Sequence, residues 1–362
     1  MQLPVTGHPL HTRSLTVVVS RRADGRLAAR GVVNDLRKCG FVPMMQGLQP
    51  AGIIHQMSID LALDPASRRI EALDTDQPFV AIEPSEWTQG ECCRDPAPQL
   101  EALVGEPIDA AFPKKLSSVF GGPRGCSHLL TLFQLMASAL PRALDREDRL
   151  LAELGVERQA GERLFWRSCF LDGYEARGGE IELAVQLHDF HGHPQVRVES
   201  PLDRLHLHQE VRGFARVASP SLSLPELCAF ERTRERATLA SAGWTSHEAA
   251  LAPLVGAPII PGLARRIFER FGDAPETAVL RDALLQLAPG HIQVMAAVTD
   301  RWFAQVRGEE IREAGNPRKG PPVGAIGGMV DSCWMWRRKG ALGSNRLFVP
   351  PSADDAHGPA TR

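Results

Sequence analysis

One segment of the chain recurs in its second half, and this recurrence limits the possible fold more than any other feature. Leu103-Val-Gly-Glu-Pro-Ile108 returns as Leu254-Val-Gly-Ala-Pro-Ile259 at a shift of 151, and the match runs without a gap for about 35 positions. Two further matches lie upstream, Asn34-Asp35-Leu36 with His188-Asp189-Phe190 at a shift of 154, and His55-Gln56 with His208-Gln209 at a shift of 153. Matches in the same order predict a tandem duplication.

The two copies share an order of patterns, with strand candidates first and helical ones afterwards. Met57–Leu63 alternates apolar and polar residues, and from about residue 96 apolar residues recur at helical spacing. Further strands are expected at 15–20, 27–33, 69–73, 181–187, 195–199 and 211–217, and further helices at 112–120, 129–140, 246–254, 261–272 and 277–297. We expect an α+β fold of two similar units related by a pseudo-twofold axis, each an antiparallel sheet followed by a helical segment.

The expected boundaries follow from these patterns. Residues 1–142 form the first repeat, 143–163 a helical connector, and 164–300 the second, degenerate repeat. Residues 314–362 are rich in Gly, Pro, Arg and Lys without periodicity, which predicts a mostly disordered tail. Within it, Cys333-Trp-Met-Trp336 is either a short docking segment or a cluster without a role.

Charge and cysteine content exclude several classes of protein. The 362 residues carry a formal net charge of −2, which gives no electrostatic case for a nucleic-acid partner. No apolar run approaches the roughly 18 residues of a membrane helix, and the start of the chain lacks the pattern of a signal peptide. Seven cysteines at irregular spacing are a poor disulfide framework, so we expect a reducing, cytoplasmic location.

The residues that differ between the two copies mark the candidate site. Framework Leu, Gly, Pro and Phe positions stay, whereas ligand-type residues change in the second copy, Cys93 to Trp244, Cys126 to Thr277, His128 to Val279 and Arg124 to Pro275. Thiol and imidazole groups are the preferred ligands of zinc and related metals. We predict a metal site formed by His55, Cys93, Cys126 and His128, holding Zn²⁺, or else iron or an iron–sulfur cluster. If 126–128 were already helical, Cys126 and His128 would point about 200° apart and could not both bind.

Two other interpretations of these residues stay open. Without a metal, Cys126 could be a nucleophile at a helix start, favoured by Arg124 and deprotonated by His128 or His55. The candidate catalytic residues are therefore Cys126, His128 and Arg124. Alternatively, the cysteines are buried structural thiols, which is common for free cysteine.

Other polar residues carry weaker signals. Cys92 lies beside Cys93 and is interpreted as a bystander, and Asp35, which recurs as Asp189, as a turn or capping residue. A second histidine group is either a solvated turn or a second metal site, and its members are His188, His191, His193, His206 and His208. The sequence contains no dinucleotide fingerprint, P-loop, nucleophile elbow, HExxH or EF-hand loop, which argues against those enzyme classes.

Several motifs together resemble a known bacterial family. They are Asp24-Gly-Arg-Leu27, Ile54-His-Gln-Met57, Cys93 before Leu103-Val-Gly105, and Gly121-Gly-Pro-Arg-Gly-Cys-Ser-His-Leu129. The chain resembles the family called domain of unknown function 2889 over about 14–140, and more faintly over 165–297, as a tandem pair. Members are similar in ending the last motif Gly-Cys-Thr-His-Leu-Thr-Glu-Leu, whose Glu is absent from Leu130-Thr131-Leu132 here, and in carrying an acid where Gln56 stands. The resemblance therefore implies an altered or weakened site here.

The order of His55, Cys93 and Cys126 is also distantly similar to that of NifU-like iron–sulfur scaffold proteins, which implies an antiparallel sheet with helices on one face.

We predict a metal-binding protein, an enzyme of the lyase or hydrolase type that acts on a small organic substrate, aromatic or carbonyl in character. The alternatives are a metal or iron–sulfur scaffold protein and a non-catalytic protein with buried Cys and His. The expected partner is a small molecule, with neither nucleic acid nor membrane, and the pseudo-dimer could be a monomer or a homodimer.

Overall fold

The fold is mixed α+β, and its centre is one sheet of nine antiparallel strands. The computed structural model describes residues 1–39, 51–194, 201–272, 274–312 and 330–344, with backbone only for 201–202 and 300–312. The strand order is β4-β3-β2-β1-β5-β6-β7-β8-β9. The predicted fold class is therefore correct, although the two expected sheets are one continuous sheet, because β1 pairs with β5.

The first four strands form one half of the sheet, and the helices that follow cover it. The strands are β1 (His8–Arg21), β2 (Leu27–Arg37), β3 (Gly52–Leu63) and β4 (Ile70–Phe79). The helices are η1 (Ala97–Leu103), α1 (Phe112–Phe120), η2 (Gly122–Arg124) and α2 (Ser127–Leu154). Helix α2 ends at Gly155, whose left-handed φ of 63° suits glycine. The expected connector is thus largely the end of α2.

The remaining strands form the other half. They are β5 (Arg163–Glu175), β6 (Ile181–Gly192), β7 (Leu205–Val217), β8 (Glu226–Glu235) and β9 (Thr245–Ser246). Short 3-10 turns separate them: η3 (Arg177–Gly179), η4 (Pro201–Arg204) and η5 (Arg236–Thr238). The sequence patterns missed β5 and β8, and the expected strand at 195–199 lies outside the described residues.

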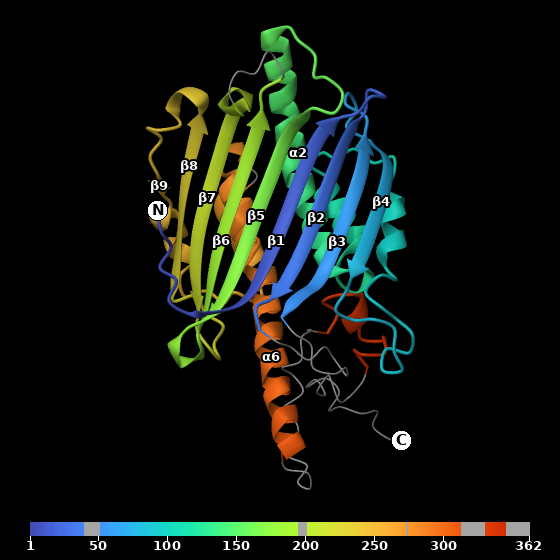
Figure 1. Ribbon diagram of the computed structural model, residues 1–362, viewed down its shortest axis with the longest axis vertical. Helices are drawn as coiled ribbons and strands as arrows, with labels where there is room; N and C mark the ends of the chain where they lie inside the picture. Colours follow the sequence, from blue (N-terminus) through green and yellow to red (C-terminus); the bar gives the residue numbers. More distant parts are fainter. Residues whose placement is uncertain (40–50, 195–200, 273, 313–329, 345–362) are drawn as a thin grey trace, which may run out of the picture.

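A second set of helices follows these strands. They are α3 (Glu248–Leu251), η6 (Ala252–Leu254), α4 (Leu263–Phe271), η7 (Pro275–Thr277), α5 (Ala278–Leu284) and α6 (Leu287–Arg312). Figure 1 shows the long helices α2 and α6 on one face of the sheet, while the opposite face carries no helix in the described part of the chain. No helix in the described ranges is both long and apolar enough to cross a membrane.

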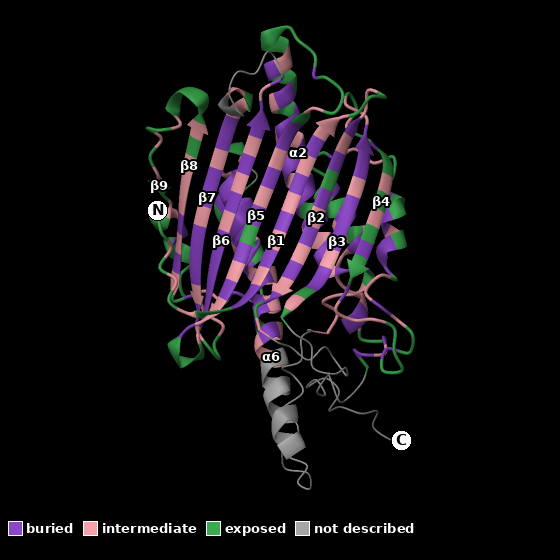
Figure 2. Cartoon of the chain, viewed as in Figure 1, coloured by how far each residue is buried: buried purple, intermediate pink, exposed green. Residues whose placement is uncertain are grey.

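The core lies between the sheet and the helices, because alternate strand residues are apolar. In β1, Leu15, Val17 and Val19 are fully buried, whereas the residues between them are only partly buried. Figure 2 shows this alternation as bands across the strands. One hydrophobic cluster continues from the first half into the second, so the two predicted units share a core.

Pairing in the two halves follows the same register. Arg13 lies opposite Asp35 in the β1–β2 pair, and Arg167 lies opposite Asp189 at the corresponding place in the β5–β6 pair. At the junction of the halves, Leu15 lies opposite Cys169, the residue that corresponds to it under the same shift.

The same register corrects one sequence match. His55 lies opposite Asp35, but the residue opposite Asp189 is Gln209, not His208. A shift of one residue moves a strand side chain to the other face of the sheet. His208 is therefore not the counterpart of His55.

Part of the expected disordered tail is ordered. The 3-10 turn η9 (Trp334–Trp336) lies beside η2, and the backbone N–H of Trp334 donates to the carbonyl of Gly125 over 2.8 Å. Met335, Trp336 and Leu342 are buried in a small cluster against which Cys93 packs. Residues 330–344 thus dock on the first half, whereas 313–329 and 345–362 lie outside the described residues.

Candidate functional site

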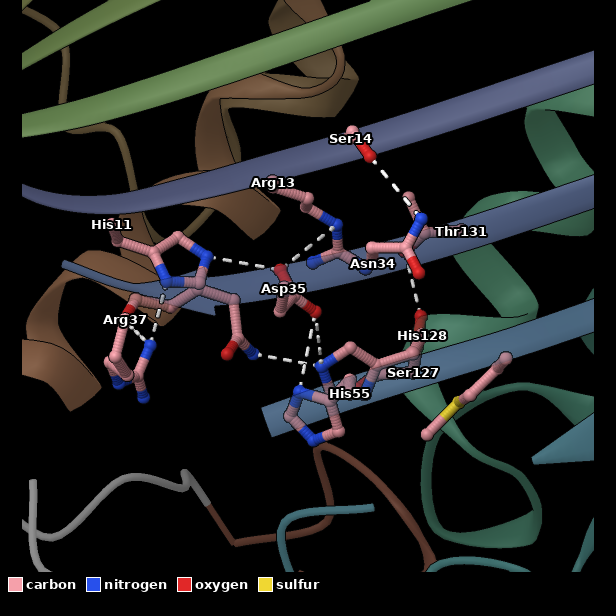
Figure 3. Close-up of polar contacts among 12 residues, drawn as sticks. His11, Arg13, Ser14, Asn34, Asp35, Arg37, His55, Ser127, His128 and Thr131 are labelled. Carbon is pink, nitrogen blue, oxygen red and sulfur yellow. Dashed lines mark hydrogen bonds and ion pairs between the residues drawn. The ribbon is translucent and has the colours of Figure 1, made fainter. Parts of the chain in front are cut away.

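Three ligand-type side chains from three elements meet on the helix-covered face of the sheet. Asp35 comes from β2, His55 from the paired position of β3, and His128 from the first turn of α2. All three are buried, with exposed fractions of 0%, 4% and 8%. Figure 3 shows both imidazoles directed at the carboxylate of Asp35.

The distances within this Asp-His-His group are short. Nδ1 of His55 lies 3.3 Å from Oδ2 of Asp35, and Nε2 of His128 lies 3.4 Å from the same oxygen. The two imidazole rings have centroids 3.8 Å apart. One carboxylate oxygen and two ring nitrogens therefore face one small volume.

Neighbouring residues fix the other carboxylate oxygen. Nε2 of His11 lies 3.0 Å from Oδ1 of Asp35, and Nη1 of Arg37 lies 2.8 Å from Nδ1 of His11. Because a guanidinium only donates, His11 must accept at Nδ1 and donate from Nε2 to Asp35. The Nε of Arg13 lies 3.8 Å from the same oxygen. Oδ1 is thus satisfied, and Oδ2 is directed at His55 and His128.

The protonation states follow from burial and charge. Burial opposes ionisation of Asp35, but Arg13, His11 and His55 hold the pKa of its carboxyl well below the usual range. Burial lowers the pKa of His55 and, more strongly, that of His128. The group is therefore an ionised carboxylate beside neutral imidazoles, and these are the forms that bind metals.

Two atoms of this group lack hydrogen bonds. Within the described part of the chain, Oδ2 of Asp35 and Nδ1 of His55 have no hydrogen-bond partner, so their 3.3 Å contact is not aligned as a hydrogen bond. A buried polar group left unpaired costs about 1–3 kcal/mol. Such a cost at the meeting point of three ligand-type side chains indicates a site that another atom completes.

The spacing fits a metal ion. Ligand atoms bound to zinc at about 2.1 Å in tetrahedral geometry are separated by about 3.4 Å. The two nitrogen–oxygen distances, 3.3 and 3.4 Å, agree with that value, and all three ligand atoms lie within 4.8 Å of one another. The donor set of one carboxylate and two imidazoles suits Zn²⁺ or Fe²⁺.

Cys126 lies next to this group without joining it. It is the N-cap residue of α2, so it lies before the helix proper, and its Sγ is 3.8 Å from Nδ1 of His128. The expected conflict between Cys126 and His128 is therefore avoided, but the sulfur meets the opposite ring nitrogen from the one directed at Asp35. Sγ also lies 3.9 Å from Sδ of Met57, which is part of the core.

The other two predicted site residues, Cys93 and Arg124, do not join the Asp-His-His group. Cys93 packs between the main core and the 330–344 segment, and neither Cys93 nor Cys126 belongs to a group of described ligand atoms within 4.8 Å of each other. Arg124 is exposed, and its Nη2 donates to the carbonyl of Ser117 at the end of α1. The structure thus brings together His55 and His128, and adds an acid that the sequence analysis had placed in a turn.

Asp35, His11 and Arg37 were missed as site residues. Asp35 is fully buried within β2, so the predicted capping role is wrong. Its recurrence as Asp189 suggested a shared framework role. The pairing of β1 with β2 carries the signal for their role, because it places His11 opposite Arg37 at the end of the strand pair that also contains Asp35.

The corresponding position in the second half is closed. Arg167 donates to both oxygens of Asp189 over 2.6 Å, and also to Asp282 over 2.6 Å. Both oxygens of Asp189 are thus used by one guanidinium, whereas Arg13 stands 3.8 Å from Asp35. The same Arg–Asp pair is a satisfied ion pair in one half and an open site in the other.

Two members of the second histidine group, His188 and His208, lie together on the uncovered face and are already satisfied, whereas His191 lies on the helix-covered face opposite Phe165. Arg234 donates to Nδ1 of His208 over 3.0 Å, so Nε2 of His208 carries the proton and donates to Nδ1 of His188, 3.2 Å away. Arg212 and Arg232 bind the oxygens of the neighbouring Glu210. Because Nε2 of His208 has no free lone pair, His188, His208 and Glu210 do not form a second metal site.

Comparison with known protein families gives a match in the first half of the chain. The sequence profile of a family described as "Protein of unknown function (DUF2889)" matches residues 11–141. The matched region contains the whole Asp-His-His group together with His11, Arg13 and Arg37. No curated protein and no solved structure matches the chain significantly.

Proposed function

We propose that the chain binds one divalent metal ion, Zn²⁺ or Fe²⁺, through Asp35, His55 and His128, and uses it as an enzyme on a small organic substrate. The observation that carries the proposal is the pair of buried atoms without hydrogen bonds in the described part of the chain, Oδ2 of Asp35 and Nδ1 of His55, facing Nε2 of His128. These three atoms supply three ligands and leave further positions open.

The ligand set favours catalysis over a purely structural ion. Structural zinc sites are closed by four protein ligands, whereas two histidines and a carboxylate leave room for water or substrate. A bound ion would supply Lewis-acid chemistry, which polarises a carbonyl oxygen or lowers the pKa of a bound water. This chemistry supports a hydrolase or lyase acting on a carbonyl compound.

The depth of the site supports a small substrate. Asp35 is inaccessible to solvent, and His55 and His128 are almost so. A scaffold that passes its metal to a protein partner needs exposed ligands, and these ligands are buried on the helix-covered face. The proposal therefore favours an enzyme over an assembly protein.

The chain's own residues prepare the site. Through His11, Arg37 holds the Asp35 carboxylate in one orientation and leaves Oδ2 for the ion. The charge of Arg13 keeps the carboxylate ionised. The amide Nε2 of Gln293 on α6 lies 3.1 Å from Nε2 of His128 and, since an amide nitrogen only donates, it donates to the lone pair that the ion would take. Gln293 must therefore give way when the ion binds, so the second half of the chain holds a first-half ligand in place until then.

We also infer that the chain is a tandem duplication whose second copy lost the site. The equal registers of the strand pairs support this, as does the closed Arg167–Asp189 pair where the first copy has an open one. In this view the change from His55 to Gln209 removed one ligand, and the change from His128 to Val279 removed another.

Elemental analysis of the purified protein tests the metal assignment. We expect about one Zn or Fe per chain in the wild type, and less than a tenth of that in His55→Ala and Asp35→Asn, because either change removes a ligand. Gln209→Ala is the matched control, since Gln209 holds the second-half position that corresponds to His55. Cys93→Ser, which changes an originally predicted ligand, should also keep its metal.

The opposite results would overturn the assignment. Folded wild-type protein without metal after growth and dialysis in excess Zn²⁺ and, anaerobically, in excess Fe²⁺ would exclude the site. Loss of metal in Cys93→Ser with retention in Asp35→Asn would move the site to the thiols.

A further inference from the structure

The uncovered face of the sheet carries opposite charge at its two ends. At the β3–β4 end, Asp60, Asp74 and Asp76 share this face with Arg30, which pairs with Asp60 over 2.8 Å. The two remaining carboxylates, on Asp74 and Asp76, are exposed. We call Asp74 and Asp76 the acidic strip.

The β7–β8 end of the same face is basic. Three arginines surround one carboxylate there, since Arg212, Arg232 and Arg234 all lie within 3.3 Å of Glu210. Each of the three side chains keeps 20–27% of its surface exposed. We call these three arginines the basic patch. Together with the negative charge of Glu210, the patch has a net charge of +2.

An aromatic residue holds the basic patch in place. The guanidinium of Arg232 lies 4.4 Å from the ring centre of Trp244, and that of Arg212 lies 5.2 Å from it. Cation–π contacts of this kind limit the freedom of the arginines. The charges are therefore ordered before any partner arrives, which lowers the entropy lost on binding.

The two charged ends lie at matching heights on the strands. Residues that pair across the sheet form a row from Asp74 through Val18 and Trp166 to Arg234, and the next row runs from Asp76 to Arg232. A second sheet placed face to face, and related to the first by a twofold axis parallel to the strands, has the two ends exchanged. Asp74 of one copy then faces Arg234 of the other, and Asp76 faces Arg232.

The middle of the face suits an interface. Phe170 is 40% exposed near the centre of the sheet, and Trp166 stacks on Phe190 with ring centres 4.7 Å apart. Exposed aromatic residues between polar margins are typical of protein–protein interfaces. The N-terminal segment covers part of the β6–β8 end, because Thr6 and Gly7 bond to Glu182 and Arg212 of the basic patch donates to the carbonyl of Met1 over 2.6 Å. Arg232 and Arg234 are therefore the residues of the patch left for a partner.

The size of the face is sufficient for a dimer. The strands β1 to β8 have 10–14 residues each. Eight strands at about 4.8 Å spacing, each roughly 30 Å long, present about 1,100 Å², and a stable interface needs about 800 Å² from each partner. No described helix lies over this face (Figure 1). Charge, position and area are thus all satisfied by a second copy of the same chain.

We propose that two copies of this chain dimerise through the uncovered faces of their sheets, with the acidic strip of each copy against the basic patch of the other. Such an interface is isologous, so every ion pair is formed twice. The catalytic proposal is independent of this one, since the Asp-His-His group lies on the opposite face.

Sedimentation equilibrium of the full chain at micromolar concentration tests the proposal. We expect a dimer for the wild type. Asp74→Lys/Asp76→Lys should weaken dimerisation by about tenfold or more, since four attractive contacts become repulsive. The control Glu101→Lys/Glu269→Lys makes the same change in net charge on the helical side and should leave the dimer intact.

A charge-swap mixture gives the decisive result. Arg232→Glu/Arg234→Glu should also be monomeric, but mixed with Asp74→Lys/Asp76→Lys it should form a heterodimer, since each contact again joins opposite charges. If the arginine variant does not fold, the aspartate variant and its control still decide. A monomeric wild type, a dimer insensitive to the aspartate changes, or a mixture of the two folded variants that does not associate would each overturn the proposal.

Discussion

Nη1 of Arg37 lies 2.8 Å from Nδ1 of His11, and this single contact determines which nitrogen of His11 carries its proton. The guanidinium can only donate, so the proton is on Nε2 and is directed at Oδ1 of Asp35. This bond leaves Oδ2 of Asp35 as the oxygen directed at the proposed metal site. The orientation of the carboxylate is therefore set within the β1–β2 pair, although that pair contributes only one of the three ligands.

We predict that His11→Ala weakens metal binding without removing a ligand. Loss of the hydrogen bond frees the Asp35 carboxylate to rotate, and losses of this kind typically cost about 10–100-fold in metal affinity. Competition with a chelator of known affinity measures the effect. His8→Ala, an exposed histidine on the same strand, is the control. Equal affinity in the His11 variant and the wild type would show that His11 does not orient the carboxylate.

The ion pairs of the second half should act on stability instead. Asp189→Asn leaves the buried guanidinium of Arg167 with only Asp282 as an acidic partner among the described residues, so we expect the free energy of unfolding to fall by about 3 kcal/mol. Urea denaturation measures this, and the metal content should stay unchanged. The exposed pair of Arg30 and Asp60 offers a control, since Asp60→Asn should cost at most about 1 kcal/mol. A loss of metal in Asp189→Asn would mean that the two halves are not separate in function.

The order of strands and helices could be predicted because it depends on local periodicity. Met57–Leu63 alternates and lies within β3, and the apolar spacing of 261–272 corresponds to α4. Strand β8 was missed because the charged residues of Glu226–Glu235 are typical of a loop. In the structure they form ion pairs between β8 and β7. The pairing of β1 with β5 joins segments that lie far apart in the sequence, and no local pattern encodes it.

The site was half predictable for a similar reason. His128 stood out because Val279 stands at the matched position in the second half, whereas His55, which was matched with His208, was included as a ligand-type residue just before a predicted strand. Asp35 did not, because it recurs as Asp189, and its role depends on how its arginine is placed, at 3.8 Å from Arg13 against 2.6 Å between Arg167 and Asp189. Two sequences with the same Arg and Asp can thus form a closed ion pair or an open ligand, and only packing distinguishes them.

The contact between β5 and α6 should couple stability to the site. A Cβ added at Gly173 would overlap Cγ2 of Val294, so Gly173→Ala must push α6 away from the sheet. We expect a loss of about 1–3 kcal/mol of stability, as for other overpacked cores. Helix α6 also carries Gln293, whose amide donates to Nε2 of His128, the nitrogen proposed to bind the ion, so metal affinity should change as well.

A double mutant separates the overlap from other effects of the Gly173 change. In Gly173→Ala/Val294→Ala the added methyl group meets a shortened side chain, so the double mutant should lose less stability than the sum of the two single mutants. Thermal unfolding and chelator competition on the four proteins measure both quantities. Additive losses would show that Gly173 and Val294 do not share the contact that positions α6.

His291 on α6 should make the protein sensitive to mild acid. It is 1% exposed, neither ring nitrogen has a hydrogen bond within the described residues, and burial lowers its pKa to about 4. The unfolded chain takes up this proton near pH 6.5, so the contribution of His291 to stability is complete above that pH. It is lost as the pH falls from about 6.5 towards 4, by up to about 1.4 kcal/mol per pH unit.

We predict that His291→Leu, which fills a similar volume without an unpaired polar group, raises the free energy of unfolding by about 1–3 kcal/mol at neutral pH. The gain should be larger at pH 5, whereas the exposed His8→Leu control should follow the wild type, with urea denaturation at both values as the measurement. If His291→Leu lost stability at pH 7 and kept the wild-type dependence on pH, the imidazole would have a partner that its surroundings do not show.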